Sequence, residues 1–484
     1  MAHIELLDET FRDGMQSLWG MRLQAGMALP VAGYVDRTGF RRIDLTGSNH
    51  FEVLVRYCKE DPWAFTDAMV EAMPRTILRG GMRSNAMATF RTSPHAVMDA
   101  WMRQLNVHGM RSFWIYDVLF NIDKMLRLAK IAKEFGSEVA GSIMFTLSPV
   151  HTDEYYADKA DKLSASPDVD TLLLYDTAGV LEKERMKTLI PAILAKSHGK
   201  PIEFHSNNLL GMSAKNYLDA IELGVSIIHT ASRPMANGPS VPSTEIMVNN
   251  LELLGHTHSL DKSMFAPVAH HMERVGKAAG FLVNQYSEYN VLSIQHQIPG
   301  GMTGTLKAQL AQHGMSDQLD DVLREIAIVR RELGYPGMAT PFSQLVGIQA
   351  VLNLVKGERY TTVPDEIIEY ALGYYGETVA PIEPNVLDKI LGSARAKTVR
   401  ANPPEQPTIE ELRKRYGTDN DDELLLRIMI PESDIERMRA AGPLKRDYPL
   451  LSSPELEQVG RLVSITSLPV VQMRSAEVSL TLRR

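Results

Sequence analysis

The sequence predicts an α/β protein built on a TIM (β/α)8 barrel that is followed by a mostly helical domain. Three observations lead to this fold class. In the first half, short apolar runs typical of strands alternate with longer stretches of helical pattern. Polar side chains collect where the apolar runs end. From about residue 286 the strand-like runs give way to apolar residues at helical spacing.

Eight strand candidates precede residue 231. Eight units over roughly 250 residues, each followed by a helical stretch, fit a closed parallel barrel better than an open doubly wound sheet. No Gly-rich nucleotide-binding motif follows any of them, so neither a dinucleotide nor a P-loop nucleotide is expected. The candidates span residues 4–7, 42–45, 75–79, 112–117, 138–146, 171–176, 202–205 and 226–230.

The carboxyl ends of the predicted strands carry polar residues. Barrel enzymes place their chemistry at this end, so an active site is expected there. The residues are Asp44, Arg79, Asp117, Asp176, His205 and His229.

The second half is expected to form two further units. Residues 309–333 and 364–374 have helical spacing, and residues 401–407 form a proline-rich linker. After the linker, residues 408–441 read as helical with Thr408 as a cap, and residues 459–482 contain short β-like runs. We therefore expect a barrel domain over 1–285, a helical domain over 286–400 and a C-terminal extension over 401–484.

Composition excludes several classes of protein. The 484 residues carry a net charge of −8, which disfavours nucleic acid as a partner. There is no apolar stretch of about 18 residues that could span a membrane, and no signal-peptide pattern. The one cysteine, Cys58, cannot form an internal disulfide. These features predict a cytoplasmic globular protein.

The stretch after the first predicted strand concentrates the chemistry. Arg12, Asp13 and Gln16 lie within five residues of one another where that strand should end. In a barrel, Asp13 could face a metal while Arg12 and Gln16 present donors to an anionic substrate. The alternative is a surface turn that contains an Arg–Asp pair.

The order Asp8-x-Thr10-x-Arg12-Asp13-x-x-Gln16-Ser17 resembles the opening motif of the biotin-dependent carboxyltransferases. That family includes pyruvate carboxylase, the oxaloacetate decarboxylase alpha subunit and the transcarboxylase large subunit. The resemblance runs from about residue 4 to about residue 395. Further similar segments occur in the same order at residues 145–152, 231–242, 299–302 and 334–353.

The resemblance implies roles for single residues. Arg12, Gln16 and Arg79 would hold the carboxylate of a keto acid, with Tyr175 near the substrate. Thr340 would carry the proton between biotin and substrate, because a hydroxyl both donates and accepts. Biotin would lie against Ser343 and Gln344. The catalytic group would comprise Thr340, Asp13 and Arg12.

Two positions depart from the family pattern. Tyr175 stands where the family has a carbamylated, metal-binding lysine, and Asn207 stands where it has a second histidine. The remaining set, Asp13, His205 and Asn207, is rich in oxygen, which favours Mg²⁺ or Mn²⁺ over Zn²⁺. The alternative is that no metal binds.

The resemblance predicts the activity and its partners. The chain would transfer CO₂ between carboxybiotin and a small organic acid, with pyruvate or oxaloacetate as first candidates. A biotinyl-lysine motif is absent from the sequence, so a separate carrier protein and a biotin carboxylase subunit are expected, along with a homo-oligomer. The alternatives are a biotin-independent metallolyase or aldolase and a catalytically silent scaffold subunit.

Overall fold

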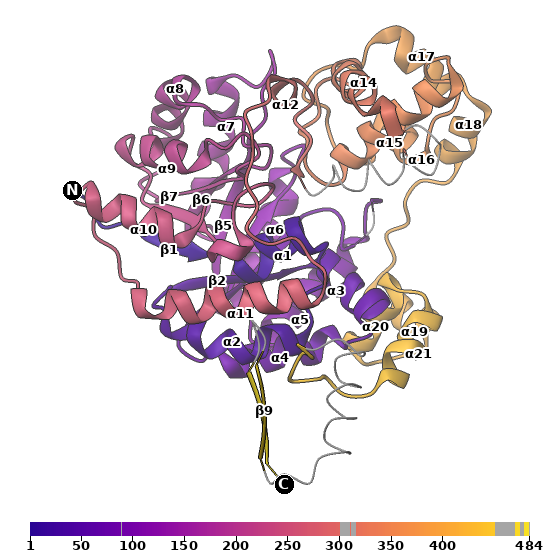
Figure 1. Ribbon diagram of the computed structural model, residues 1–484. Coiled ribbons are helices and arrows are strands. Elements are labelled where there is room, and N and C mark those ends of the chain that lie inside the picture. Colours follow the sequence, from indigo (N-terminus) through magenta and orange to yellow (C-terminus); the bar gives the residue numbers. More distant parts are fainter. Residues whose placement is uncertain (89, 301–309, 311–315, 451–469, 475–478, 484) are drawn as a thin grey trace.

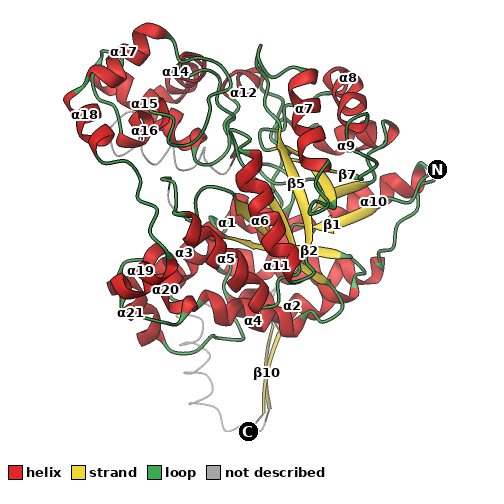
Figure 2. Cartoon of the chain, turned by 180° about the vertical axis from the view of Figure 1, so that it is seen from behind, coloured by secondary structure: helices red, strands yellow, loops and turns green. Residues whose placement is uncertain are grey.

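The computed structural model describes residues 1–484 except 89, 301–309, 311–315, 451–469, 475–478 and 484 (Figure 1). Eight parallel strands form a closed barrel in sequence order, with β8 paired to β1. Figure 2 shows these strands enclosed by helices. The predicted fold class is confirmed. The strands are β1 (Glu5–Asp8), β2 (Arg42–Gly47), β3 (Ile77–Arg83), β4 (Ser112–Tyr116), β5 (Glu138–Met144), β6 (Thr171–Asp176), β7 (Ile202–Ser206) and β8 (Ile227–Thr230).

The barrel strands bury different chemistry on their two faces. On β7, Phe204 packs outward against Tyr217 of a covering helix, with 5.2 Å between ring centroids. Side chains alternate along a strand, so Glu203 and His205 share the opposite face, and both are fully buried. The interior of this barrel therefore contains charged residues as well as the usual branched apolar ones.

Helices follow the strands and cover the outside of the barrel. Their apolar faces pack on the sheet, as the βα alternation of the sequence requires. The segments are η1 (Thr10–Gly14), α1 (Met15–Trp19), α2 (Ala25–Arg37), α3 (Ser48–Val53), η2 (Leu54–Cys58), α4 (Pro62–Ala72), α5 (His95–Val107), α6 (Ile122–Glu134), α7 (Asp153–Ser164), α8 (Lys183–Leu194), α9 (Ser213–Glu222), η3 (Arg233–Met235), α10 (Thr244–Leu253), η4 (Lys262–Met264) and α11 (Phe265–Ala278).

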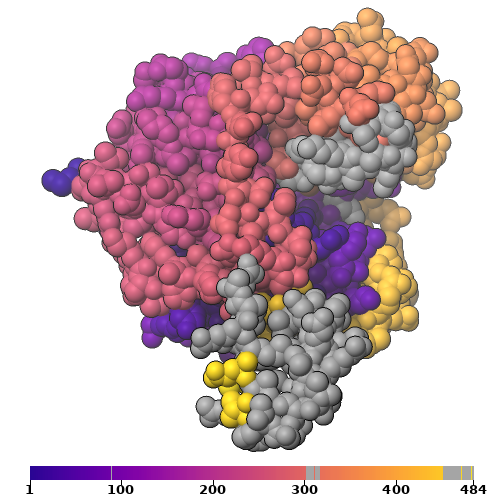
Figure 3. Space-filling view, in the orientation of Figure 1, coloured from indigo at the N-terminus to yellow at the C-terminus, as the bar shows by residue number. Residues whose placement is uncertain are grey.

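A helical unit follows the barrel and lies against one side of it (Figure 3). Arg330 joins the two parts, because its guanidinium donates to Thr146 Oγ1 and to the Leu147 carbonyl, both at 2.8 Å. The described helices are α12 (Val291–His296), η5 (Ser316–Gln318), α14 (Leu319–Glu332), α15 (Phe342–Lys356), α16 (Asp365–Ala371), α17 (Pro384–Gly392) and α18 (Ala394–Ala401).

The C-terminal segment returns to the outside of the barrel. Thr408 caps its first helix through a capping box with Glu411, as its sequence indicated. Asp422 then docks on the barrel, where its carboxylate accepts from Gln104 Nε2 at 2.6 Å. The elements are α19 (Ile409–Tyr416), α20 (Asp421–Met429), α21 (Glu432–Ala441) and an antiparallel hairpin of β9 (Val470–Arg474) and β10 (Ser479–Arg483).

The expected domain limits fall at identifiable places in the chain. The limit at 285 lies in the loop after α11, and the limit at 400 lies one residue before the end of α18. Parts of the expected segments 309–333 and 459–482 lie outside the described residues. Within the described part of the chain, no helix is both long enough and apolar enough to cross a membrane.

Candidate active site at the barrel mouth

A cleft of about 680 Å³ opens between the barrel mouth and the helical unit. Its walls come from the ends of β1, β6 and β7 and from the beginning of α15. Of the ten site residues that the sequence predicted, seven line this cleft: Asp13, Gln16, Tyr175, Asn207, Thr340, Ser343 and Gln344. The structure thus brings together residues more than 300 positions apart.

The turn after β1 sets Arg12 and Asp13 in place. The Asp8 carboxylate accepts hydrogen bonds from the Thr10 backbone N at 3.1 Å and from Thr10 Oγ1 at 2.7 Å. These contacts bend the chain into η1. Gly14 ends the turn against Met235, whose Cβ would lie 2.8 Å from any added methyl group, so a side chain at position 14 would displace the turn.

Arg12 is buried behind the cleft wall. Its Nη1 and Nη2 both donate to the Tyr175 hydroxyl at 3.1 Å, and its guanidinium lies over the Trp114 ring at 4.6 Å. Burial raises the pKa of Tyr175 above its ordinary value, so the phenol keeps its proton at neutral pH. A neutral phenol is a poor metal ligand but a good hydrogen-bond donor.

Asp13 is held by donors on several sides. Its carboxylate accepts from Ser240 Oγ at 2.8 Å, from the Val241 backbone N at 3.2 Å and from Asn207 Nδ2 at 3.1 Å. The same Asn207 nitrogen donates to the Pro239 carbonyl at 2.9 Å. Since a carbonyl only accepts, the amide nitrogen of Asn207, not its oxygen, faces Asp13.

The predicted metal ligands Asp13, His205 and Asn207 do lie together, but they are not arranged as a ligand set. Asn207 presents a nitrogen that carries protons and cannot bind a cation. His205 directs Nδ1 toward Glu9 Oε1 at 3.3 Å, while its Nε2 is 3.7 Å from Asp13 Oδ1. These three residues do not fit a metal ion as they stand, and no chemical step is assigned to a metal here.

Arg79 occupies a different place from the one expected. Strand β3 runs to Arg83, beyond the predicted end at residue 79, so Arg79 lies in mid-strand. Its side chain is fully buried inside the barrel, where Nη1 binds Glu203 Oε2 at 2.6 Å. Arg79 does not line the cleft, and the expected clamp of Arg12, Gln16 and Arg79 is corrected to Gln16 in the wall with Arg12 behind it.

Thr340, Ser343 and Gln344 form a chain of hydroxyl and amide groups in the opposite wall. Gln344 Nε2 donates to Thr340 Oγ1 at 3.1 Å, and Ser343 Oγ donates to Gln344 Oε1 at 3.0 Å. The preceding loop is tied to the barrel where Thr177 Oγ1 meets the Met338 carbonyl at 3.4 Å. This chain holds the Thr340 oxygen as an acceptor.

Several residues that support the site were missed by sequence reasoning. Gln297 accepts from Thr146 Oγ1 at 2.8 Å and so acts with Arg330 on the same loop. Trp114 and Ser240 contact Arg12 and Asp13. A buried arginine before the Gly-Tyr-Pro-Gly turn was the available signal for Arg330, but nothing in the sequence marked the others.

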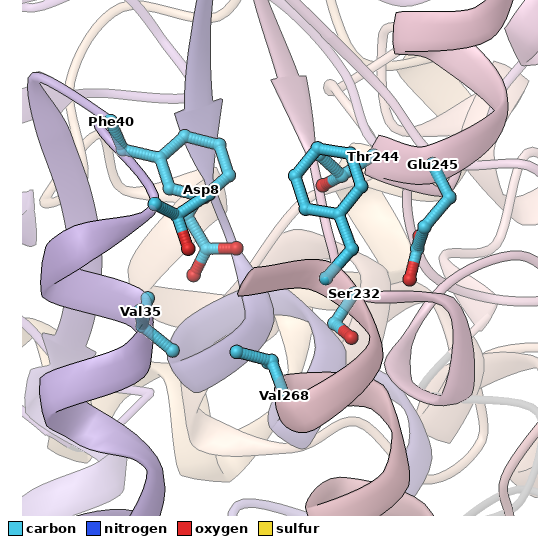
Figure 4. Close-up of a pocket in the computed structure, with 9 residues that line it drawn as sticks. Asp8, Val35, Phe40, Ser232, Thr244, Glu245 and Val268 are labelled. Carbon is cyan, nitrogen blue, oxygen red and sulfur yellow. The ribbon is translucent and has the colours of Figure 1, made fainter. Parts of the chain in front are cut away.

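A second, smaller cavity lies outside the barrel between β1 and the helices α2, α10 and α11 (Figure 4). Its volume of about 20 Å³ is enough for one water molecule and too small for a substrate. Asp8 reaches it, and burial raises the pKa of that carboxyl group to about 7. This cavity is not a substrate site.

Comparisons with known proteins agree with this geometry. The protein-family model of the conserved carboxylase domain matches residues 294–453. A pyruvate carboxylase subunit of Methanocaldococcus jannaschii is 30% identical, and the alignment covers 97% of this chain and 82% of the relative. The 2-oxoglutarate carboxylase large subunit of Hydrogenobacter thermophilus is 30% identical over 88% of this chain and 67% of its own length.

A solved structure has the same fold. The carboxyl transferase domain of Rhizobium etli pyruvate carboxylase superposes with a TM-score of 0.81 at 22% identity, covering 91% of this chain and 77% of that one. Together with the relatives, this result accounts for both the barrel and the helical unit that closes its mouth. The chain belongs to the carboxyltransferase family of the biotin-dependent carboxylases.

Proposed function

We propose that this protein transfers a carboxyl group between carboxybiotin on a separate carrier protein and a small enolisable 2-keto acid. One observation carries the proposal: barrel residues that can bind an acid and the Thr340 chain that can move a proton line one cleft. Relatives named pyruvate carboxylase and 2-oxoglutarate carboxylase support the substrate class. Pyruvate and oxaloacetate remain the first candidates.

Tyr175 is the residue suited to stabilise the enolate oxygen. Its oxygen already accepts two hydrogen bonds from Arg12, so its own O–H must point elsewhere, and Tyr175 lines the cleft. A donor polarised by a guanidinium can stabilise negative charge that develops on the substrate. Gln16, in the same wall, can donate to the substrate carboxylate.

Thr340 is the residue suited to carry the proton. Carboxybiotin supplies the CO₂ when the carrier delivers it to the cleft. Gln344 occupies a lone pair of Thr340 Oγ1, which leaves the hydroxyl proton free to be donated and a second lone pair free to accept the substrate proton. Ser343 and Gln344 bind at the biotin side.

The partners follow from the reaction. The 484-residue sequence contains no Ala-Met-Lys-Met motif, so we propose a separate biotin carboxyl carrier protein and a biotin carboxylase subunit. A homo-oligomer is part of the same proposal. Size-exclusion chromatography with light scattering, alone and with the carrier, tests these assemblies.

The function is tested with oxaloacetate and biocytin. We expect oxaloacetate decarboxylation that depends on biocytin, and we expect Thr340→Ala to reduce it about 10²- to 10⁴-fold while Thr340→Ser keeps most of the rate. Decarboxylation that needs no biocytin would favour the metallolyase alternative. No turnover with any 2-keto acid, together with tight binding of the carrier, would favour the scaffold alternative.

A further inference from the structure

Three buried side chains converge just below the floor of the cleft. They are Glu9, which follows β1, His205 on β7 and His229 on β8, each at most 1% exposed. Glu9 Oε1 lies 2.8 Å from His229 Nδ1 and 3.3 Å from His205 Nδ1, and the two Nδ1 atoms are 3.1 Å apart. One oxygen and two nitrogens thus point at a common centre.

Hydrogen bonds alone cannot satisfy this triangle. A carboxylate oxygen contributes no proton, and each Nδ1 contributes at most one. If both nitrogens carry a proton, each can donate to Glu9, but the two N–H groups then face each other at 3.1 Å. If one carries a proton, at least one edge joins two lone pairs. A cation at the centre removes this conflict, because all three atoms can then act as ligands.

The size of the triangle fits a coordination sphere. Around an ion with bonds of about 2.1 Å, adjacent ligands of an octahedron lie about 3.0 Å apart, and those of a tetrahedron about 3.4 Å. The three separations fall between 2.8 and 3.3 Å. Glu9, His205 and His229 therefore have the spacing of three ligands on one face of a metal ion.

Both imidazoles also have a carboxylate beyond the far nitrogen. His229 Nε2 lies 3.1 Å from Glu203 Oε2, and His205 Nε2 lies 3.7 Å from Asp13 Oδ1. A carboxylate behind a ligating histidine fixes its tautomer and turns the other nitrogen toward the metal. Glu203 is itself held by Arg42 and Arg79, at 2.9 and 2.6 Å.

Unpartnered atoms point to a missing ligand at the same place. Among the residues that the structure describes, Glu9 Oε2 and His205 Nε2 are buried without a hydrogen-bond partner. Burying such groups unpaired costs free energy that a bound cation would offset, through a second carboxylate oxygen and a stronger His205–Asp13 contact.

We propose that Glu9 Oε1, His205 Nδ1 and His229 Nδ1 bind a divalent first-row transition-metal ion, with Zn²⁺ as the probe. Two imidazoles and one carboxylate suit Zn²⁺, Mn²⁺ or Fe²⁺ better than Mg²⁺. Binding releases the protons that the two Nδ1 atoms carry. The ion lies below Tyr175, whose ring centroid is 4.4 Å from that of His205, and Asp13 orients His205 without ligating the ion. The site does not depend on the proposed carboxyl transfer.

Elemental analysis of full-length protein expressed with added zinc tests the site. We expect about one ion per chain in the wild type and at least a tenfold loss in Glu9→Gln and His229→Gln. Asp13→Asn and His151→Gln should keep the ion. His151 is the matched histidine control, because it is buried but binds Ser148 Oγ at 2.6 Å, away from the cluster.

X-ray absorption at the zinc edge of the wild type gives a second readout that no variant can compromise by unfolding. Two imidazoles in the first shell are expected, whereas a site at Asp13, His205 and Asn207 would contain one. The proposal is overturned if the wild type holds no stoichiometric zinc, if the spectrum shows fewer than two imidazoles, or if Asp13→Asn loses the ion while folded His229→Gln retains it.

Discussion

Arg12 donates both terminal nitrogens to the hydroxyl of Tyr175 at 3.1 Å, and this contact joins the turn after β1 to the end of β6. An arginine would ordinarily be expected to bind a substrate carboxylate itself. Here its charge reaches the cleft through a phenol whose oxygen is fully engaged as an acceptor. The pair therefore presents one polarised O–H donor in place of a guanidinium fork.

Replacing Tyr175 with phenylalanine should separate this role from packing. The change removes the polarised donor, and we expect kcat/KM to fall about 10²- to 10³-fold, as for loss of an oxyanion donor. The effect should appear mainly in kcat. Tyr217→Phe is the control, because Tyr217 is fully buried on α9 and accepts from the Ser206 backbone N at 3.0 Å, outside the cleft lining. A normal kcat in Tyr175→Phe would contradict the assignment.

Arg330 should couple the helical unit to the barrel. Arg330→Met leaves the Leu147 and Pro336 carbonyls without this donor, and we expect about 2–3 kcal/mol lower unfolding free energy and reduced kcat, because the loop leading to Thr340 loses its support. Urea denaturation and steady-state kinetics measure both.

The neighbouring residue provides the control for Arg330. Arg331 is half exposed and lies 3.5 Å from Glu383, so Arg331→Met should change stability by less than about 1 kcal/mol. Equal effects of the two substitutions would show that the contact with the barrel does not matter.

Much of the barrel could be predicted from the sequence, because buried parallel strands give continuous apolar runs between helical patterns. The depth of a residue inside the barrel could not. Arg79 was expected at a strand end, but the small residues Gly80 and Gly81 extend β3 to Arg83 and leave Arg79 in the interior. A pattern of period two fixes the face of a strand, not how far the strand continues.

The partners of polar side chains were equally hidden. Asn207 was expected to offer its oxygen, and only the position of the Pro239 carbonyl fixes the amide the other way. Glu9 and His229 are 220 residues apart, and no local pattern links them. The Thr340 segment was easier to recognise because its residues are contiguous and precede a long helix.

Glu203 should be the residue on which the barrel interior most depends. It is fully buried and accepts from Arg42, Arg79 and His229. Glu203→Gln leaves two buried guanidinium groups without their shared carboxylate, so we expect a loss of about 3–5 kcal/mol in unfolding free energy. Glu184→Gln, at an 81%-exposed side chain paired with Lys187, should change it by less than about 1 kcal/mol. Chemical denaturation of both variants checks this difference.

His108 should make the docking of the C-terminal segment depend on pH. Its Nδ1 lies 2.6 Å from Asp67 and its Nε2 lies 3.1 Å from Asp422 of α20. Although burial opposes the charge, the hydrogen bonds to Asp422 and Asp67 raise the pKa of His108 from 6.5 to about 8. Because the folded protein binds the proton more tightly, this contribution is fully present below pH 6.5 and is lost as the pH rises through 8.

The size of the effect is about 1 kcal/mol after screening by salt, and it should be measurable as a fall in unfolding free energy between pH 6 and pH 8.5. His108→Gln should remove that part of the pH dependence, whereas His198→Gln, at a half-exposed histidine near Asp161, should leave it unchanged. Proteolysis after α18 should accelerate over the same pH range, because loss of the charge weakens the contact that holds α20 on α5. An identical pH profile for the wild type and His108→Gln would refute this role.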